Sequence, residues 1–485
     1  MIRPHHTFIR FSMSTLYQKV AKDIAQDIEQ GVYLTGQKVP SVRSLSKVKA
    51  VSISTITQAY ALLEDQGYLS AKPQSGYYVK DGANDPVMPP PISKGSEPEV
   101  VKKNDIISMM LNAVHQDSLI NFGAAIAHES LMPQHALQTH INKVSRFHSK
   151  QVFNYLFSPG LESLRRQIAT RMRNVGVKCH PDDIIITHGC SEALNLCLRT
   201  TTQPGDIIAV ESPCYYGFLQ LAGLLGLKVI EIPTDAQKGI SIDALTLALK
   251  QWPIRLIAVS ARYSNPTGAA IDSRKQKQLF DLAQKYDVKI LEDDIYGELG
   301  FDQSLNTVIK TFDTDGRVMH CSSFSKTLSP GLRVGWCISG EHHDDIIQEQ
   351  TYSSFSPSSL SQYALSSYLE SGHYDKHLRK TRALCKQNVD AITQLVKQFF
   401  PAGTRISQPR GGFIIWLALP EKTDVMAMQR SALKEGINMA PGAMFSNTGE
   451  FDHYIRLNCA IPIDGQVNQA VKTLGRVASE NLILA

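Results

Sequence analysis

The sequence predicts a multidomain chain, in which a small α+β domain with three helices and a β-hairpin precedes a large α/β domain. Three observations support this fold class. Apolar residues near the N-terminus recur with helical spacing. A proline-rich stretch then begins at about residue 81, and beyond about residue 115 several short apolar strands end in polar or glycine residues, as in an open α/β sheet. A length of 485 residues allows two or three domains with their own cores.

The N-terminal domain begins with a helix, predicted over residues 16–28. Its apolar residues recur every four positions on one face, namely Leu16, Val20, Ile24 and Ile28. A second helix follows the serine cap at Ser41, and a third is predicted over residues 52–63. Residues 72–79 combine a turn at Gly76 with an aromatic strand, which is typical of a β-hairpin.

Three helices followed by a hairpin are the plan of a winged helix-turn-helix, whose third helix enters the major groove of DNA. Residues 38–49 hold four basic residues and no acidic one, as a surface that faces phosphates requires. A solvated face is the alternative explanation of such a charge run, but the helical pattern favours DNA binding. The residues expected to contact DNA are Arg43, Ser52, Ser54, Thr55, Thr57 and Lys72.

This domain resembles the DNA-binding domain of GntR-type regulators. The resemblance is specific in Lys38-Val-Pro-Ser-Val-Arg43-Ser-Leu and in Gly67-Tyr68-Leu69 leading to Gln74-Ser75-Gly76-Tyr77. Many GntR-type proteins carry an arginine at the position of Ile53. Since a guanidinium contact to a base is worth about 1–3 kcal/mol of discrimination, this departure leaves the preferred DNA sequence open.

Proline-rich sequence separates the two domains. Five prolines lie between residues 81 and 104, among glycine, serine and lysine. Such a stretch buries too little apolar surface to fold and indicates a semi-extended tether. We therefore predict an N-terminal domain over residues 14–80, a flexible linker over 81–114 and a large domain over 115–485, and we assign no role to residues 1–13.

In the large domain, residues 322–333 place Lys326 among hydroxyls and glycine, with Arg333 seven positions later. A lysine that loses its proton near neutral pH can form a Schiff base, and a phosphate needs hydroxyl or N–H donors plus a guanidinium. Pyridoxal phosphate needs both. If this segment is considered alone, a solvated loop without a cofactor is the alternative interpretation.

Three more segments point to the same cofactor. Asp293 ends a short apolar strand, where it can pair with a pyridine nitrogen, and Tyr296 can donate to the ring's phenolic oxygen. The turn at Asn265-Pro-Thr-Gly can aim an amide at that same oxygen. A β-branched strand over residues 184–187 breaks at Gly189 into a helix start, whose N–H groups attract phosphate. Taken one at a time, each segment also has a purely structural explanation: Asp293 as a helix cap, Asn265-Pro-Thr-Gly as a turn, and Gly189 as a structural glycine.

The order of these motifs, together with Glu211-Ser-Pro-Cys-Tyr215, resembles the fold type I aminotransferases over roughly residues 115–480. The resemblance implies that Lys326 carries the internal aldimine of pyridoxal 5'-phosphate (PLP). It also implies that Asp293 pairs with the pyridine nitrogen and that Asn265 and Tyr296 hold the ring oxygen O3′. The implied phosphate ligands are Gly189, Cys190, Ser191, Ser323 and Arg333.

Three further roles follow from this resemblance. Tyr215 would stack on the face of the ring. Arg456 would hold the α-carboxylate of a substrate or effector as a bidentate fork. Tyr155 would reach the phosphate of the partner subunit.

A GntR-type domain, a proline-rich linker and an aminotransferase-like domain together resemble the MocR subfamily of regulators, over nearly the whole chain. The resemblance implies a PLP-dependent transcriptional regulator that binds double-stranded operator DNA and senses PLP or a small amino compound, as a head-to-tail homodimer. The alternative is a catalytically active PLP-dependent aminotransferase with an accessory DNA-binding domain, because the residues for transamination are present. A DNA-binding scaffold without cofactor is a third possibility.

Composition agrees with a globular protein, since 43% of the residues are hydrophobic and 20% are charged. The chain has no apolar run of membrane-spanning length, so we expect no membrane association. The net charge of +5 is mild, and DNA binding would therefore depend on local patches. The eight cysteines form no CxxC pair, and we expect neither a disulfide framework nor a metal site. The N-terminus lacks the apolar region of a signal peptide, which favours the cytoplasm.

Overall fold

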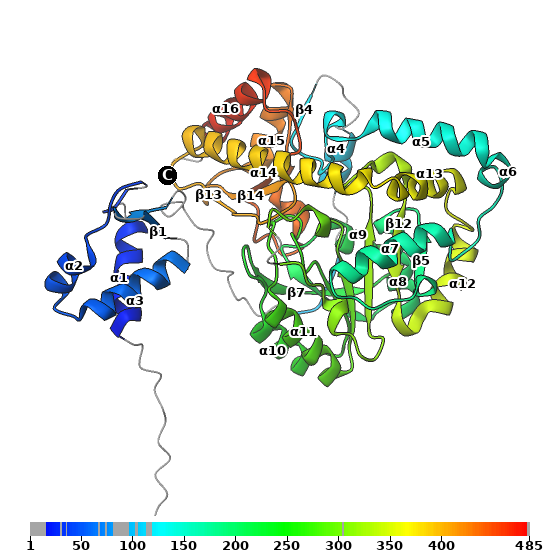
Figure 1. Ribbon diagram of the computed structural model, residues 1–485, viewed down its shortest axis with the longest axis horizontal. Coiled ribbons are helices and arrows are strands. Elements are labelled where there is room, and N and C mark those ends of the chain that lie inside the picture. The colour runs from blue at the N-terminus through cyan, green and yellow to red at the C-terminus, as the bar shows by residue number, and fades with distance from the viewer. Residues whose placement is uncertain are drawn as a thin grey trace, which may run out of the picture. The chain divides into compact units, whose positions relative to one another are not determined.

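The computed structural model (Figure 1) describes residues 16–29, 32–34, 36–65, 68–72, 75–80, 97–101, 105–112, 119–302 and 305–482. The chain divides into two compact units, residues 1–87 and 88–485, which we call the head and the body. Residues 1–13, most of the predicted linker, and Gly67 and Gln74 of the GntR-type motif lie outside the described residues.

The head has three helices and an antiparallel hairpin, which confirms the predicted winged helix-turn-helix. Its elements are α1 Leu16–Glu29, α2 Val42–Lys49, α3 Ile53–Asp65, β1 Leu69–Lys72 and β2 Gly76–Val79. Val20, Ile24 and Ile28 of the predicted stripe are buried, whereas Leu16 is 55% exposed. The stripe therefore reaches the core only from the second turn of α1 onward.

Tyr60 of α3 joins the helices of the head to its hairpin. Its side chain is fully buried, its hydroxyl donates to the carbonyl of Pro40 at 2.6 Å, and its ring centroid lies 4.9 Å from that of Tyr77. Ile56 and Leu63, one turn away on either side, are also fully buried. A single small core thus supports the whole head.

A mixed sheet of nine strands forms the centre of the body, in the order β3-β7-β6-β9-β10-β11-β12-β5, with β8 paired to β7. Strands β7, β6, β9, β10 and β11 run parallel, whereas β12 is antiparallel to both of its neighbours. The bounds are β3 Glu99–Val100, β5 Ile184–Thr187, β6 Ile207–Ser212, β7 Lys228–Asp235, β8 Gly239–Ile240, β9 Ile254–Val259, β10 Lys289–Asp293, β11 Val318–Ser323 and β12 Gly335–Ile338.

Helices cover both faces of this sheet, which explains its continuous apolar strands. Helices α8, α9 and α12 share one core with alternate strand residues such as Leu291, while α10 and α11 share the opposite core with residues such as Ile290. The bounds are α5 Gln134–Phe147, α6 Ser149–Val152, α7 Glu162–Asn174, α8 Cys190–Thr201, α9 Tyr216–Leu224, α10 Ile242–Gln251, α11 Ser273–Tyr286, α12 His343–Ser353 and α13 Ser359–Glu370.

A second, antiparallel sheet of four strands follows toward the C-terminus, in the order β13-β14-β17-β16. Its bounds are β13 Arg405–Ile406, β14 Ile414–Ala418, β16 Ala440–Pro441 and β17 Tyr454–Asn458, and β15 Ile437–Asn438 pairs in parallel with β4 Ile120–Asn121. Helices α14 His373–Phe399, α15 Val425–Lys434 and α16 Gly465–Glu480 pack on this sheet. The second sheet thus carries Arg456 in β17, one of its two inner strands.

The C-terminal part of the predicted linker contains secondary structure, which differs from a flexible tether over residues 81–114. Strand β3 pairs antiparallel with β7 at the edge of the large sheet, and helix α4 covers Asp105–Asn112. Ile107 and Met110 of α4 are buried against Trp416 and other residues of the body. These apolar residues lie beyond the prolines, so this segment can bury enough surface to fold.

Among the described residues, no helix is both long enough and apolar enough to cross a membrane. All eight cysteines are free thiols, and all except Cys179 are buried.

Replacement of Ile56 by alanine should destabilise the head by about 2–5 kcal/mol, because it removes a fully buried side chain from a small core. Ile53→Ala is the matched control, since Ile53 lies in the same helix but is 55% exposed, and it should change stability by no more than about 0.5 kcal/mol. Native-state hydrogen exchange of peptides from residues 16–79, in the full-length protein, measures both. Equal effects of the two substitutions would contradict the observed packing.

Candidate functional site

A cavity of about 220 Å³ lies in the body, at the carboxyl ends of the parallel strands β9, β10 and β11. Ligand sites of open α/β sheets lie at this edge. Nine predicted site residues line the cavity: Cys190, Ser191, Tyr215, Asn265, Asp293, Tyr296, Lys326, Arg333 and Arg456. The fold thus brings together side chains that are up to 266 positions apart, from Cys190 to Arg456.

Lys326 lies in the loop that follows β11 and extends into the cavity. Its Nζ donates to the carbonyl of Ala125 at 2.6 Å and lies 5.9 Å from the centroid of the Tyr296 ring. Burial, and then the positive charge of Arg456, lower the pKa of the Lys326 amine to about 8. A substantial fraction of this amine is therefore neutral, and nucleophilic, near pH 7 to 8.

Asp293 ends β10 and is 4% exposed. Its Oδ1 accepts the backbone N–H of Ile295 at 3.1 Å and the thiol of Cys190 at 3.4 Å. Burial raises the pKa of Asp293 to about 6, and burial also raises the pKa of the Cys190 thiol well above its ordinary value. At neutral pH the pair is therefore a carboxylate that accepts from a protonated thiol, and the carboxylate retains lone pairs for a cationic partner.

Arg456 also lines the cavity and is 1% exposed. It donates from Nη1 to Asn265 Oδ1 at 3.1 Å and from Nη2 to the carbonyl of Gly123. Arg456 Nε and the hydroxyl of Tyr296 are buried and have no hydrogen-bond partner among the described residues. Because buried polar groups are nearly always paired, these donors indicate that the cavity accommodates a ligand with acceptor atoms.

The cavity is suited to an anion near the N-terminus of helix α8. Helix α8 begins there at Cys190, directly after Gly189, which adopts a φ of +83°. This positive φ favours glycine, and the backbone of Gly189 lies close to the Arg333 guanidinium, since an added Cβ would be 2.7 Å from Arg333 Nη2. The Ser323 hydroxyl, which accepts the N–H of Ser325 at 3.3 Å, lies at the end of β11. A helix N-terminus, hydroxyls and a guanidinium form a typical phosphate site.

The two predicted tyrosines occupy different places. Tyr215 lines the cavity as the residue before α9, with its ring centroid 4.8 Å from that of Tyr216. Tyr155 does not line the cavity of its own chain. It is 70% exposed and its ring lies 5.8 Å from that of Phe157 and 5.0 Å from that of Phe355.

Several lining residues were missed by the sequence analysis, among them Ala125, Tyr216, Ser260 and Arg262. Ala125 contributes a backbone carbonyl, which no side-chain motif can reveal. Ser260 and Arg262 follow the apolar strand β9 directly, and the position of a polar and a charged residue at such a strand end is a signal that could have identified them.

In the head, the predicted DNA contacts lie on α2, at the start of α3 and in the hairpin. Arg43, Ser52, Ser54, Thr57 and Lys72 are exposed, and Thr55 is half-buried. Helix α3 begins at Ile53, one residue later than predicted, because Ser52 acts as the cap and accepts the N–H of Thr55 at 3.1 Å.

The charged residues of the head are unequally available to phosphates. Arg43 has no ion pair among the described residues, whereas Lys49 pairs with Asp23 at 3.0 Å. Lys72 lies 4.4 Å from the centroid of the Tyr78 ring.

Comparison with known proteins assigns both parts of the chain. Residues 16–79 match the family of bacterial regulatory proteins called gntR, and residues 120–474 match aminotransferase class I and II. The chain is 39% identical over 462 residues to the uncharacterized HTH-type transcriptional regulator YjiR of Escherichia coli, covering 95% of this chain and 98% of YjiR. It is 37% identical over 467 residues to the uncharacterized HTH-type transcriptional regulator YdcR of the same organism, covering 96% and 99%.

Solved structures agree for the body. A kynurenine aminotransferase of Pyrococcus horikoshii, solved in complex with PMP, is 26% identical and superimposes with a TM-score of 0.74, covering 79% of this chain and 96% of that one. The chain therefore belongs to the MocR subfamily, the GntR-type regulators in which a winged helix-turn-helix domain is joined to an aminotransferase class I and II domain.

Proposed function

We propose that this protein is a PLP-dependent transcriptional regulator, whose head binds operator DNA and whose body holds PLP through Lys326 and senses PLP or a small amino compound. One observation carries the proposal. A chain with a DNA-binding head also has a cavity in which an amine of lowered pKa, a buried carboxylate and a buried guanidinium converge.

The residues of the cavity fit the functional groups of PLP. Asp293 suits the pyridine nitrogen, and Tyr215 suits the ring face. Asn265 suits O3′, as does the hydroxyl of Tyr296, which has no hydrogen-bond partner in the described part of the chain. The proposed phosphate ligands are Gly189, Cys190, Ser191, Ser323 and Arg333. When bound, PLP supplies an electron-withdrawing ring and an aldehyde that condenses with amines.

Arg456 supports an effector with a carboxylate. Its guanidinium presents Nη1 and Nη2 to Asn265 and to the carbonyl of Gly123, and both are replaceable neutral acceptors. A carboxylate forms stronger, charge-assisted hydrogen bonds with arginine than these neutral acceptors do. An incoming amino acid would therefore displace the carbonyl of Gly123, and the segment that follows β4 would have to shift.

A shift of that segment would be transmitted to helix α4, near the start of the body, through contacts of Asn438. The Asn438 amide donates to Asn121 Oδ1 at 3.1 Å and to the carbonyl of Met110, in α4, at 3.3 Å. A Cβ at Gly123 would lie only 2.8 Å from Asn438 Nδ2, so the two residues are in close contact. Since α4 lies at the start of the body, within the C-terminal part of the predicted linker, these contacts support a coupling of ligand binding to that segment.

Exposed aromatic residues support a homodimer. Tyr155, Phe157 and Phe355 are 70%, 57% and 46% exposed and pack on one another. Such a patch of large apolar side chains is typical of an interface. We propose that a second subunit covers it, and that Tyr155 thereby reaches the phosphate held by the partner, in a head-to-tail dimer.

An active aminotransferase is the second candidate, because Lys326, Asp293 and Arg456 line the same cavity. Measurement of keto acid released from amino acids by the PLP-loaded protein, in parallel with DNA binding, distinguishes the two functions. Rapid turnover without specific DNA binding would favour the enzyme, whereas ligand-dependent DNA binding would favour the regulator.

Borohydride reduction of the protein mixed with PLP should attach the cofactor to Lys326, because this amine lies in the cavity and has a lowered pKa. Peptide mass spectrometry locates the label. Lys326→Ala should abolish specific labelling, while Lys275→Ala should not. Lys275 is the matched control, because burial lowers its pKa too but its Nζ donates to the carbonyl of Lys238, outside the cavity. Labelling elsewhere than Lys326 would contradict the assignment.

The rate at which PLP attaches to the protein should rise with pH and level off above about pH 8, since only the neutral amine is a nucleophile. Below that pH the rate should fall about tenfold per pH unit. Stopped-flow absorbance measures the rate. Arg456→Gln should move the midpoint to higher pH, because the charge of Arg456 lowers the Lys326 pKa, and Arg456→Lys should move it less. A parent midpoint near the ordinary lysine value of 10.5 would refute the prediction.

Arg43→Ala should weaken binding of the full-length protein to a fluorescent DNA duplex and make the plot of log K against log salt shallower by about 0.9, the contribution of one phosphate contact. Lys49→Ala should have a smaller effect, because Asp23 already compensates the Lys49 charge. Anisotropy titrations at several salt concentrations test both. An unchanged slope in Arg43→Ala would exclude this contact.

A further inference from the structure

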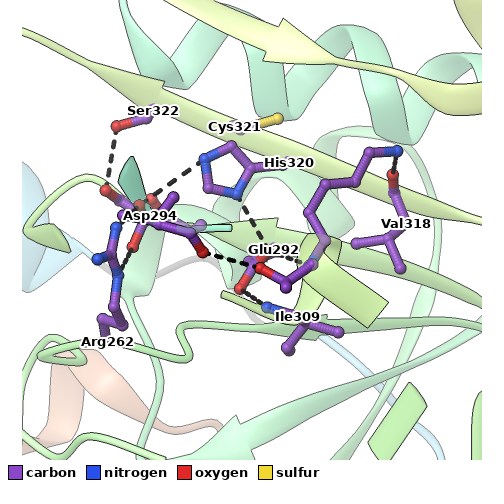
Figure 2. A network of polar contacts seen from close by, with 12 residues as sticks. Arg262, Glu292, Asp294, Ile309, Val318, His320, Cys321 and Ser322 are labelled. Carbon is purple, nitrogen blue, oxygen red and sulfur yellow. Dashed lines mark hydrogen bonds and ion pairs between the residues drawn. The ribbon is translucent and has the colours of Figure 1, made fainter. Parts of the chain in front are cut away.

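A buried polar network adjoins the cavity, and the sequence analysis did not single it out (Figure 2). Strand β10 and the residue after it contain three consecutive acids. Because side chains alternate along a strand, Asp293 faces one way and its neighbours Glu292 and Asp294 face the other. Asp293 lines the cavity, while Glu292 and Asp294 are 0% and 5% exposed and belong to the network.

Two nitrogen-bearing side chains meet these two carboxylates. Arg262 donates from Nε to Asp294 Oδ1 at 2.8 Å and from Nη2 to Asp294 Oδ2. His320 pairs with Glu292 in the register of β10 and β11, and its Nδ1 lies 3.0 Å from Glu292 Oε2. Its Nε2 points toward Asp294 Oδ2 at 3.7 Å and, within the described part of the chain, has no hydrogen-bond partner. Figure 2 shows the imidazole between the two acids.

The charges of this network balance when His320 is protonated. Glu292 and Asp294 carry two negative charges, and Arg262 carries one positive charge. Buried charges require partners, and an unpaired one is strongly destabilising. An imidazolium at His320 would supply the second positive charge and would donate from both of its nitrogens, one toward each carboxylate.

The other ionisable groups near this network do not change the balance. Lys310 and Asp313 pair with each other at 2.7 Å, and the Lys310 amine also donates to the carbonyl of Val318. Glu292 accepts the backbone N–H groups of Ile309 at 2.7 Å and Lys310 at 3.1 Å, which are dipoles without net charge. His320 thus remains the group that can neutralise Glu292.

The network also joins the three chain segments that carry Asn265, Asp293 and Lys326. Arg262 precedes Asn265 by three positions, and Asp294 directly follows Asp293. His320 precedes Lys326 by six positions in the segment of β11. The backbone reinforces these links, since Asp294 N–H donates to the carbonyl of Cys321 at 2.9 Å and the Ser322 hydroxyl donates to the carbonyl of Asp294 at 3.0 Å.

We propose that His320, as an imidazolium between Glu292 and Asp294, is a positioning residue that aligns Asp293 and Lys326 for PLP. The inference rests on the proposed function, because it assigns His320 a role in holding the cofactor. His320 itself does not line the cavity, and it acts through the two carboxylates.

Titration of the full-length protein with PLP, followed by visible absorbance at pH 6.5, tests this role. His320→Gln should weaken PLP affinity by about tenfold or more, the size typical of lost outer-shell partners at metal sites. His180→Gln is the matched control, because His180 also lies beside an acid, Asp182, but on the surface. It should bind PLP like the parent. Equal affinity of parent and His320→Gln would overturn the proposal.

A charge-restoring variant separates positioning from simple loss of packing. Glu292→Gln combined with His320→Gln leaves the neutral pair of Arg262 and Asp294, and should recover most of the lost affinity. No recovery, in a variant with parental circular dichroism, would overturn the assignment of an imidazolium. If His320→Gln alone does not fold, the PLP affinity of this double variant, compared with that of the parent, provides the test.

The outcomes for the role of His320 and for the proposed function can be told apart. If the parent itself binds no PLP at Lys326, the proposed function fails first. If the parent binds and the variant is unchanged, only the role of His320 fails.

Discussion

The parallel pairing of β9, β10 and β11 is the constraint on which the rest of the site depends. Parallel neighbours end at the same edge of the sheet, so the residues after each strand must meet there. Asn265, Asp293 and Lys326 come from these three ends and line one cavity. Helices on both faces keep the strands dry, and burial in turn raises the Asp293 pKa and lowers the Lys326 pKa toward neutrality.

Burial of charged groups has two consequences for the site: it makes the lysine reactive, and it requires partners that compensate the buried carboxylates. Arg456 and Lys326 have lowered pKa values because both side chains are buried. The acids beside the cavity are also buried, and they remain tolerable only because Arg262, backbone N–H groups and, in our proposal, His320 compensate them. The same low polarity thus explains an activated lysine on one side of β10 and a compensated network on the other.

The head combines a small buried core with exposed faces that carry the proposed DNA contacts. Its core is small, so a few fully buried side chains such as Ile56 and Tyr60 hold three helices and a hairpin together. The faces left in water carry Arg43 and the hydroxyls at the start of α3. Its packing and its proposed DNA contacts therefore use opposite faces of the same short helices, which allows each to be tested by substitution without the other.

The sequence by itself determined the two kinds of domain and nine residues that line the cavity, because periodicity, strand-end polar residues and local motifs are all encoded over a few positions. Tertiary structure alone decided the rest. It placed the carbonyls of Gly123 and Ala125 against Arg456 and Lys326, and it folded β3 and α4 within the predicted linker. It also set His320 opposite Glu292, because strand register joins residues 28 positions apart and leaves no local pattern to detect.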